Sequence, residues 1–518
     1  MAQIIVLTMP AASHLAIHFR DERRRGIEGR VASLATLRAV IIPITWTAVT
    51  GAIGYAALVT SDVMPIRQFG AILGTCTLVA AILVMLLSPI AMCPPFRLEL
   101  PFRSDVDAKV SQGMDRLIGW VYRHPGWVVA GVLGLVLPLA LGIGRLKYES
   151  NYINAFKPDS RVVRDYATVE TRLGGIGVVE LIVPLGNKVT PGSLAKLHEF
   201  ERNLTDGEGA KAEYVLTLAT ILDPDHRLAD LVPETAQRII DDKLKLIAAT
   251  PQAELLKGFI DTSGPEVSSR ILVRLVERQS APMKSALFSR AISLARTSFG
   301  GSSYLTGLSF LMTKTTEGVI ATQWATFTWS ALGILLMLTI ALRGPILASL
   351  ALLPTLLAVA FVLGLMGWLD VKLDMATALV ASVALGLSVD DTFHCLLQFR
   401  AARRTMPFAE SLFSSYSLTG PGVILSSSAV AIGFLALRMS EFTPFSHFGT
   451  MVGIATAGST VGNLLLLPAL LSLGDHRDSS KPVSAKKPSP LSVEIEAENG
   501  SGGRVVPDVA DVPNGSAG

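Results

Sequence analysis

The chain has 518 residues, of which 50% are hydrophobic and only 17% are charged, and its mean hydropathy is +0.48. Soluble domains usually carry about 25% charged residues, so this balance excludes an ordinary soluble enzyme and favours a membrane protein. The net charge of +3 gives no reason to expect a nucleic-acid partner. The three cysteines, Cys76, Cys93 and Cys395, lie in or beside apolar segments, so no disulfide framework is expected.

Apolar stretches long enough to cross a bilayer recur along the chain. A helical span needs roughly 20 apolar residues. The stretches of about that length without Asp, Glu, Lys or Arg are Ala39–Ser61, Gln68–Phe96, Gly126–Gly144, Gly318–Leu342, Pro345–Leu369, Ser417–Leu437 and Phe448–Leu473. Two further candidates are Ala2–Phe19, which is shorter, and Met375–Phe399, which contains two acidic residues. The sequence therefore predicts an α-helical polytopic membrane protein with about nine transmembrane helices.

Basic residues predict which side of the membrane each loop occupies. The segments 20–38, 97–123 and 400–404 are rich in Lys and Arg, whereas the loops 62–67 and 370–374 are poor in them. If every candidate span crosses once, all the basic segments fall on one face. The positive-inside rule assigns that face to the cytoplasm, which places the C-terminal tail inside and residues 145–317 outside.

Two parts of the chain repeat each other. Pro65-Ile-Arg-Gln-Phe-Gly70 matches Pro444-Phe-Ser-His-Phe-Gly449, and near the same offset His14 matches His394. Residues 2–96 therefore correspond to about 382–473. The second copy has one span, an outer domain and two further spans upstream. The expectation is that the chain holds the last three spans of one six-span unit and all six of another. A truncated gene model, a split gene and a degenerate copy remain open as explanations.

The expected domain organisation follows from these patterns in chain order. It comprises the last three transmembrane helices of repeat one (1–96), a cytoplasmic loop with an amphipathic helix over 108–122 (97–125), a transmembrane helix (126–144), a periplasmic α/β domain (145–317), a five-helix transmembrane bundle (318–473) and a cytoplasmic tail (474–518). The tail is rich in Ser, Pro, Gly and acidic residues and lacks the apolar surface needed to order itself, so we predict that it is disordered.

The segment 145–317 has the composition of a soluble domain. Strand-like runs at 177–185, 212–222, 270–276 and 304–308 alternate with helix-like runs at 191–204, 234–249 and 282–297. This alternation predicts a small α/β sandwich. The segment has no Gly-rich phosphate loop, no Ser-His-Asp order and no metal-ligand spacing. A binding or conduit role is therefore favoured over catalysis, and neither a cofactor nor a metal is expected.

Asp390 and Asp391 interrupt an otherwise apolar span. A carboxylate at membrane depth costs a few kcal/mol, so such residues usually face the protein interior or a water-filled path. His394 follows at helical spacing and is within reach of both acids. Two adjacent acids in a low dielectric do not easily both ionise, which suits a group that takes up and releases a proton. The alternative is a helix that ends early and leaves both acids at the cytoplasmic interface.

Ser426, Ser427 and Ser428 lie mid-span in the next predicted helix. Their hydroxyls can hydrogen-bond the acids or water beside them, although small residues also serve ordinary helix packing. The sequence therefore predicts a proton relay of Asp390, Asp391 and His394 with three supporting serines, and no catalytic or metal-ligating residues.

The run Gly386-x3-Asp390-Asp391-x2-His394, the basic loop after it and the repeated unit together resemble one family. It is the resistance–nodulation–division (RND) superfamily, in particular its MMPL-like and hopanoid-exporter-like branch. Pro158-Asp-Ser-x-Val162 resembles the entry to that branch's outer domain, and the resemblance covers about residues 2–473. It implies a porter-like periplasmic domain, proton-driven transport with intramembrane acids as the relay, and hydrophobic or lipid-like cargo.

The first repeat departs from the family pattern. Pro10 and Ala11 stand where the acids of the second repeat stand, and one periplasmic domain is absent. The first hypothesis is export of hydrophobic or lipid-like molecules across the bacterial inner membrane, driven by the proton-motive force. The protein would act alone, as a homo-oligomer or with a separately encoded half. A non-transporting lipid-binding or lipid-sensing protein and a degenerate transporter fragment are the alternatives. An enzyme is least favoured, because no nucleophile–base arrangement is visible.

Overall fold

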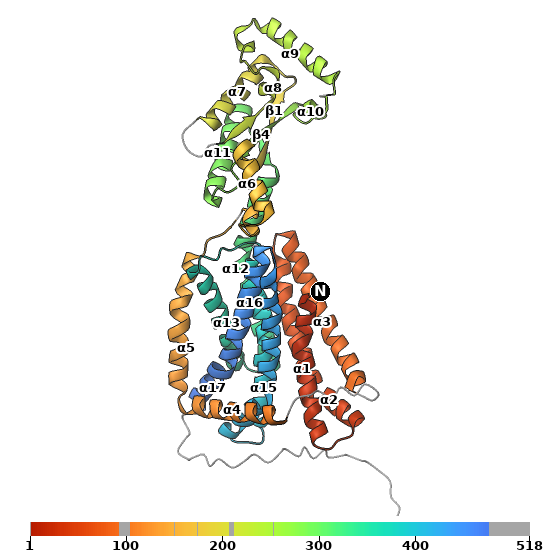
Figure 1. The fold of residues 1–518 in the computed structure, drawn as a ribbon, viewed down its shortest axis with the longest axis vertical. Coiled ribbons are helices and arrows are strands. Elements are labelled where there is room, and N and C mark those ends of the chain that lie inside the picture. Colours follow the sequence, from red (N-terminus) through yellow and green to blue (C-terminus); the bar gives the residue numbers. More distant parts are fainter. Residues whose placement is uncertain are drawn as a thin grey trace, which may run out of the picture. The chain divides into compact units, whose positions relative to one another are not determined.

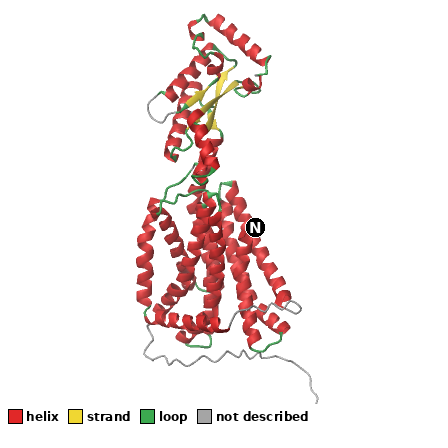
Figure 2. Cartoon of the chain, in the orientation of Figure 1, coloured by secondary structure: helices red, strands yellow, loops and turns green. Residues whose placement is uncertain are grey.

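The computed structural model describes residues 2–92, 104–149, 151–173, 175–206, 212–251 and 253–475. Within these ranges helices dominate, and the named strands all lie between α5 (Pro125–Ala140) and α12 (Leu308–Leu342) (Figure 2). The predicted disordered tail lies outside the described residues, apart from its first two positions.

Eight helices in the described part of the chain are long and apolar enough to cross a membrane. They are Gly29–Thr60, Met64–Met92, Pro125–Arg145, Leu308–Leu342, Pro345–Trp368, Thr377–Ala402, Phe408–Met439 and Thr443–Asp475. The predicted span Ala2–Phe19 lies in α1 (Ala2–Arg24), which is not one of the eight. The predicted polytopic helical fold is confirmed, with eight spans meeting the criterion rather than about nine.

The helix that carries the two acids lies at the centre of the bundle. In Thr377–Ala402, 89% of the apolar window is buried, compared with 17% in Pro125–Arg145. Its main part, α14 (Val380–Ala402), packs against neighbours from both repeats. They are α2 (Gly29–Ala56), α12, α13 (Pro345–Trp368), α15 (Phe408–Leu435) and α16 (Thr443–Val461). Figure 1 shows α1, α2 and α3 (Met64–Met92) together on one side of the bundle and α5 on the other.

The predicted amphipathic helix is present as α4 (Ser104–Arg123). Met114, Ile118 and Val121 share one face and are buried, as the helical period requires. The helix packs against α15 and α17 (Leu467–Asp475) and lies across the end of the bundle (Figure 1). Its apolar face is therefore covered by protein, while Trp120 remains exposed.

The segment between α5 and α12 folds into a small antiparallel sheet covered by helices. The strand order is β2 (Tyr214–Leu216), β4 (Val267–Leu275), β1 (Gly177–Gly186), β5 (Tyr304–Thr306), and β3 (Ile260–Asp261) also pairs with β4. The helices are α6 (Arg161–Leu173), α7 (Pro191–Thr205), α8 (Leu218–Leu222), α9 (Pro233–Ala248), α10 (Ala253–Lys257) and α11 (Ala281–Phe299). An α/β domain was predicted here, and the structure has one.

The predicted strand over 212–222 is wrong beyond Leu216. Residues 218–222 form α8, because Thr217 and Thr220 make a reciprocal capping box. The Thr217 hydroxyl accepts from the Thr220 amide at 3.2 Å, and the Thr220 hydroxyl accepts from the Thr217 amide at 3.2 Å. Two satisfied amides at a helix N-terminus favour a helical turn over continuation of the strand.

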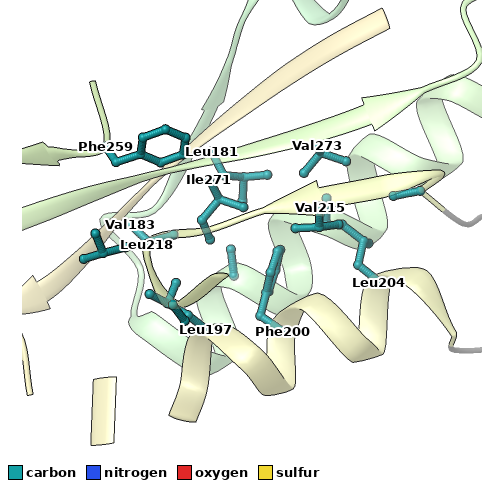
Figure 3. Packing of buried hydrophobic residues seen from close by; sticks show 14 of the residues in the cluster. Leu181, Val183, Leu197, Phe200, Leu204, Val215, Leu218, Phe259, Ile271 and Val273 are labelled. Carbon is teal, nitrogen blue, oxygen red and sulfur yellow. The ribbon is translucent and has the colours of Figure 1, made fainter. Parts of the chain in front are cut away.

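Alternation along β1 builds the core of this domain. Val179, Leu181 and Val183 are buried because successive strand residues point to opposite faces. The facing helix α7 contributes Leu197 and Phe200, which lie against the sheet (Figure 3). This core is a separate cluster from those of the membrane helices.

A buried ion pair joins α11 to the segment that follows β4, and a serine of α12 bonds to it. Lys284 and Glu277 are both fully enclosed, and the Lys284 ammonium lies 2.5 Å from the Glu277 carboxylate. Ser309, in the first turn of α12, donates to the second oxygen of Glu277 at 2.8 Å. A buried carboxylate is tolerated only when its lone pairs are satisfied, so this network fixes the start of α12 beside the segment that follows β4.

Leu197→Ala should loosen this outer domain. Removing a fully buried leucine leaves a cavity and typically costs about 2–5 kcal/mol of unfolding free energy. Hydrogen–deuterium exchange of the full-length protein in detergent should show faster exchange in β1 and β4. Lys196→Ala, at the exposed preceding position of α7, is the control and should change exchange little. Equal protection in both variants would contradict the assigned core.

Candidate proton-relay site

The two acids lie inside a continuous helix. Asp374 begins the turn before α14: its side chain accepts from the Thr377 amide at 2.8 Å, and its own amide donates to the Thr377 hydroxyl at 2.7 Å. Such a reciprocal cap favours a helix start. The helix then runs to Ala402, so Asp390 and Asp391 lie near its middle. The alternative of a helix that ends before them does not hold.

Asp391 is held by the neighbouring helix α15. Its side chain is buried, and it accepts hydrogen bonds from the hydroxyls of Ser426, at 3.2 Å, and Ser427. Hydrogen bonds to a charged group are stronger than those between neutral groups. These two bonds therefore offset part of the cost of placing a carboxylate among apolar helices.

Asp390 faces other neighbours. It lines a cavity of about 30 Å³ together with Tyr55 and Thr47 of α2, Thr77 of α3 and His394. Its Oδ1 has no hydrogen-bond partner among the described residues. A volume of roughly 10–15 Å³ is enough for one water molecule when polar partners surround it. The cavity therefore has room and polar lining for water beside Asp390.

His394 stacks on the histidine that the sequence repeat pairs with it. The ring centroids of His14 and His394 lie 3.8 Å apart, with an angle of 21° between the ring planes. Both side chains are buried. His14 comes from α1 and His394 from α14, so this contact joins the two repeats at the site.

The structure brings five of the six predicted site residues together. Asp390, Asp391 and His394 share α14, while Ser426 and Ser427 face Asp391. Ser428 is exposed and is not brought to the acids, because it is turned about 100° from Ser427 and about 200° from Ser426 around the helix.

Tyr55 was missed by the sequence analysis. Its side chain is 1% exposed and lines the cavity beside Asp390. A Cβ at Gly386 would lie 3.3 Å from the Tyr55 ring, so this glycine lets the ring pack closely one turn before Asp390. A tyrosine inside an apolar span was the available signal, since its hydroxyl usually needs a partner when buried.

A further polar contact links α14 to the last span. The Thr392 hydroxyl donates to the side chain of Asn463 at 2.7 Å, and the Tyr416 hydroxyl donates to the Asn463 carbonyl at 3.1 Å. Asn463 lies in a π-helical turn, Gly462–Leu466, between α16 and α17. Such turns often occur at functional sites, and this one turns the Asn463 backbone carbonyl toward α15.

A second cavity, of about 680 Å³, lies where α3 and α16 begin and α15 ends. Its wall combines the start of α3, the segment after α5, the N-terminal part of α12, the loop before α14, the end of α15 and the start of α16. Its volume falls within the range of roughly 300–1,000 Å³ that is usual for small-molecule sites. Among the described residues, no group of three or more His, Cys, Asp or Glu side chains could hold a metal ion.

The sequence matches known membrane proteins. The model of the MMPL family matches residues 213–489, which is more than half of the chain. A membrane protein of Methanocaldococcus jannaschii is 24% identical over 360 residues, which cover 66% of this chain and 89% of that protein. Protein patched homolog 1 of Danio rerio is 32% identical over 126 residues, which cover 24% of this chain and 10% of that protein.

Two solved structures share the fold. The hedgehog release protein Disp from the water bear Hypsibius dujardini has a TM-score of 0.61 at 14% identity, covering 91% of this chain and 62% of that one. SecDF in its super-membrane-facing form has a TM-score of 0.50 at 16% identity, covering 92% of this chain and 54% of that one. The chain thus spans less than two thirds of either structure. With the family match over more than half its length, this multi-pass membrane protein belongs to the MMPL family of the RND superfamily of transporters.

Proposed function

We propose that this protein uses the proton-motive force to export hydrophobic or lipid-like molecules across a bacterial inner membrane. It does so alone or with a separately encoded first half. The observation that carries the proposal is the position of Asp390 and Asp391, near the middle of the most enclosed helix of the bundle. Ionisable residues at membrane depth are costly and commonly serve proton or ion movement.

The two acids have separate tasks in this proposal. Asp390 exchanges protons with water in the small cavity that it shares with Tyr55 and His394. Water in this cavity can supply a hydrogen-bonded path. Asp391 then receives the proton from Asp390. Its change of charge alters the hydrogen bonds from Ser426 and Ser427, which belong to α15. The acids are adjacent in sequence, so a proton moves between them over a short distance.

Helix α15 provides the connection to the cargo path. The serines that hold Asp391 precede Gly433, Phe434 and Leu437, which line the larger cavity. Gly433 and Phe434 lie on α15 itself and Leu437 in the 3₁₀ turn, Ala436–Met439, that continues it. They are roughly 10–15 Å from the serines along the helix axis, at 1.5 Å per residue. Neutralising Asp391 weakens both charge-assisted hydrogen bonds, and a shift of α15 then changes the shape of the larger cavity.

A lipid-binding protein without transport is the second candidate. Pro10 and Ala11 occupy the first-repeat positions that match the acids, so the first repeat has no carboxyl there. A protein of this kind would bind lipid and show no proton flux. Measured flux in proteoliposomes that contain only this chain would reject it.

Asp391→Asn and Asp390→Asn should each abolish gradient-driven transport, because the amide has nearly the shape of the acid and cannot take up a proton at neutral pH. The measurement pairs proton entry into proteoliposomes, followed with a pH-sensitive dye, with export of a fluorescent lipid. Transport at the wild-type rate in both variants would contradict the proposal.

Ser427→Ala and Ser428→Ala form a matched pair. Ser427→Ala removes a donor to Asp391, and a hydrogen bond to a charged group contributes about 1.5–3 kcal/mol, so transport should slow by roughly tenfold or more. Ser428→Ala changes an exposed hydroxyl of the same helix and should leave the rate unchanged. Equal rates in the two variants would show that the serine contact plays no part in coupling.

A further inference from the structure

We propose that one face of α12 forms a path by which water and protons reach Asp390 from the outer end of the bundle, the end that leads to the outer domain. As a step of transport, this rests on the function proposed above; as a water-filled path, it does not. Two features of α12 support it. Its buried polar side chains all lie toward the outer end, and several of them have no partner among the described residues.

The buried face of α12 changes character along its length. Its buried positions recur every three or four residues, so they share one side of the helix. From the outer end to the middle, these residues are polar apart from Val319: Ser309, Thr313, Thr316, Gln323, Thr326 and Ser330. From there to the opposite end they are apolar: Ile334, Leu338 and Leu342. The polar half of this face therefore begins at the outer end and stops inside the bundle.

Gln323 is the most demanding residue on this face. Its side chain is 4% exposed, yet neither its Oε1 nor its Nε2 has a hydrogen-bond partner within the described part of the chain. A side-chain amide offers two N–H donors and one acceptor oxygen, and leaving such groups unpaired inside a protein is costly. Water molecules along α12 would give both ends of this amide their partners.

Thr326 and Ser330 continue the polar face inward. The Ser330 hydroxyl is fully enclosed and, in the residues that the structure describes, it too has no partner. The Thr326 hydroxyl donates to the backbone carbonyl of Gln323 at 2.9 Å, which leaves its oxygen able to accept. The three residues follow one another at roughly 4.5–6 Å along the helix axis. Two hydrogen bonds through one water molecule can span such a separation.

The path begins where α2 and α12 meet at the outer end. The hydroxyl oxygens of Ser61 and Thr322 lie 3.2 Å apart and are hydrogen-bonded. Ser61 follows the 3₁₀ turn Ala57–Thr60 that continues α2, and the next residue, Asp62, is exposed. Thr322 is only partly buried and directly precedes Gln323. Polar groups therefore extend from the exposed surface to the start of the buried path.

The path ends beside the cavity that contains Asp390. A Cβ at Gly54 would lie 3.5 Å from the Ser330 Oγ and 3.4 Å from the Gly386 Cα, so α2, α12 and α14 meet at this glycine. Gly386 also lines the cavity of about 30 Å³, together with Tyr55 and Asp390. Because Gly54 and Gly386 carry no side chains, Ser330 lies close to the wall of this cavity.

The apolar half of the same face closes the path toward the opposite end. Ile334, Leu338 and Leu342 belong to one buried apolar cluster with Phe393 and Leu396 of α14. Water finds no polar partners among such side chains, and apolar spaces in proteins stay dry. Access to Asp390 along α12 is therefore one-sided, so the protons that drive export arrive from the outer end.

Reaction of single cysteines with Ag⁺ tests whether this face carries water. The full-length protein is studied in proteoliposomes, in a background whose natural cysteines are replaced by serine: Cys76, Cys93 and Cys395. After exposure to Ag⁺ the protein is denatured, and the remaining thiols are labelled with a maleimide. Ag⁺ should protect Ser330→Cys from labelling. It should not protect Leu338→Cys, on the apolar half, or Thr328→Cys, on the exposed face.

No protection of Ser330→Cys overturns the proposal. Equal protection of Ser330→Cys and Leu338→Cys also overturns it, because the apolar half would then be as accessible as the polar half.

Gln323→Leu tests the middle of the path. It nearly keeps the size of the side chain and removes every donor and acceptor. In the Ser330→Cys protein it should slow the reaction with Ag⁺ at least about tenfold, since water loses its partners at this point. An unchanged rate in a folded Gln323→Leu protein overturns the path.

Thr326→Val and Thr328→Val are a matched pair that keeps the test open if Gln323→Leu does not fold. Each loses a hydroxyl that donates to a carbonyl of the preceding turn, at 2.9 Å for Thr326 and 2.8 Å for Thr328. Only Thr326 lies on the buried face. In the Ser330→Cys protein, Thr326→Val should slow the reaction with Ag⁺ about threefold or more, and Thr328→Val should not change it. Equal rates in the pair overturn the proposal.

Asp391→Asn separates this path from the proposed function. It should leave the reaction of Ser330→Cys with Ag⁺ unchanged, because Asp391 bonds to α15. Undiminished transport in Asp391→Asn would reject proton coupling through Asp391 and leave the path standing. Proton entry at the wild-type rate in Gln323→Leu, with transport abolished in Asp391→Asn, would overturn the path and leave the transport proposal standing.

Discussion

The hydrogen bonding of Asp391 inside an apolar helix bundle is the constraint on which the account depends. A carboxylate among membrane helices is tolerated only with strong local partners, and here α15 supplies two hydroxyls. Asp390, one residue earlier, instead lines a small polar cavity beside α2 and α3. One helix thus presents two acids to two sets of neighbours. A change of protonation at Asp391 would alter contacts with α15, and one at Asp390 would alter contacts with α2 and α3.

The rest of the molecule supports this helix from several directions. The stacked pair of His14 and His394 ties the first-repeat helices to α14, and Asn463 ties the last span to it through Thr392. At the end that leads to the outer domain, Ser309 of α12 bonds to Glu277, which follows β4 and pairs with Lys284 of α11. Packed cores rearrange between discrete states rather than deforming smoothly, so such links can carry a local change over long distances.

Much of this arrangement could be predicted from sequence. Apolar run length predicted the membrane helices. The acid run with its following histidine predicted the centre of the candidate site, because an ionisable residue in such a run is rare. The strand at 212–222 was misjudged, since a two-threonine capping box decides that helix start and apolar content does not. Ser428 was grouped with its neighbours, although helical rotation separates it from Asp391. Tyr55 could not be placed, because its surroundings come from segments distant in sequence.

The central claim is that the carboxyl groups of α14 change protonation state while enclosed by protein. Infrared difference spectra of the reconstituted protein, recorded between mildly acidic and alkaline pH, report the carbonyl stretch of protonated carboxyl groups directly. The account predicts a carboxyl band of low hydration in the wild-type protein. This band should be lost in Asp391→Asn, be shifted in Asp390→Asn, and change frequency in Ser427→Ala. Identical carboxyl spectra in the wild-type protein and both asparagine variants would contradict it.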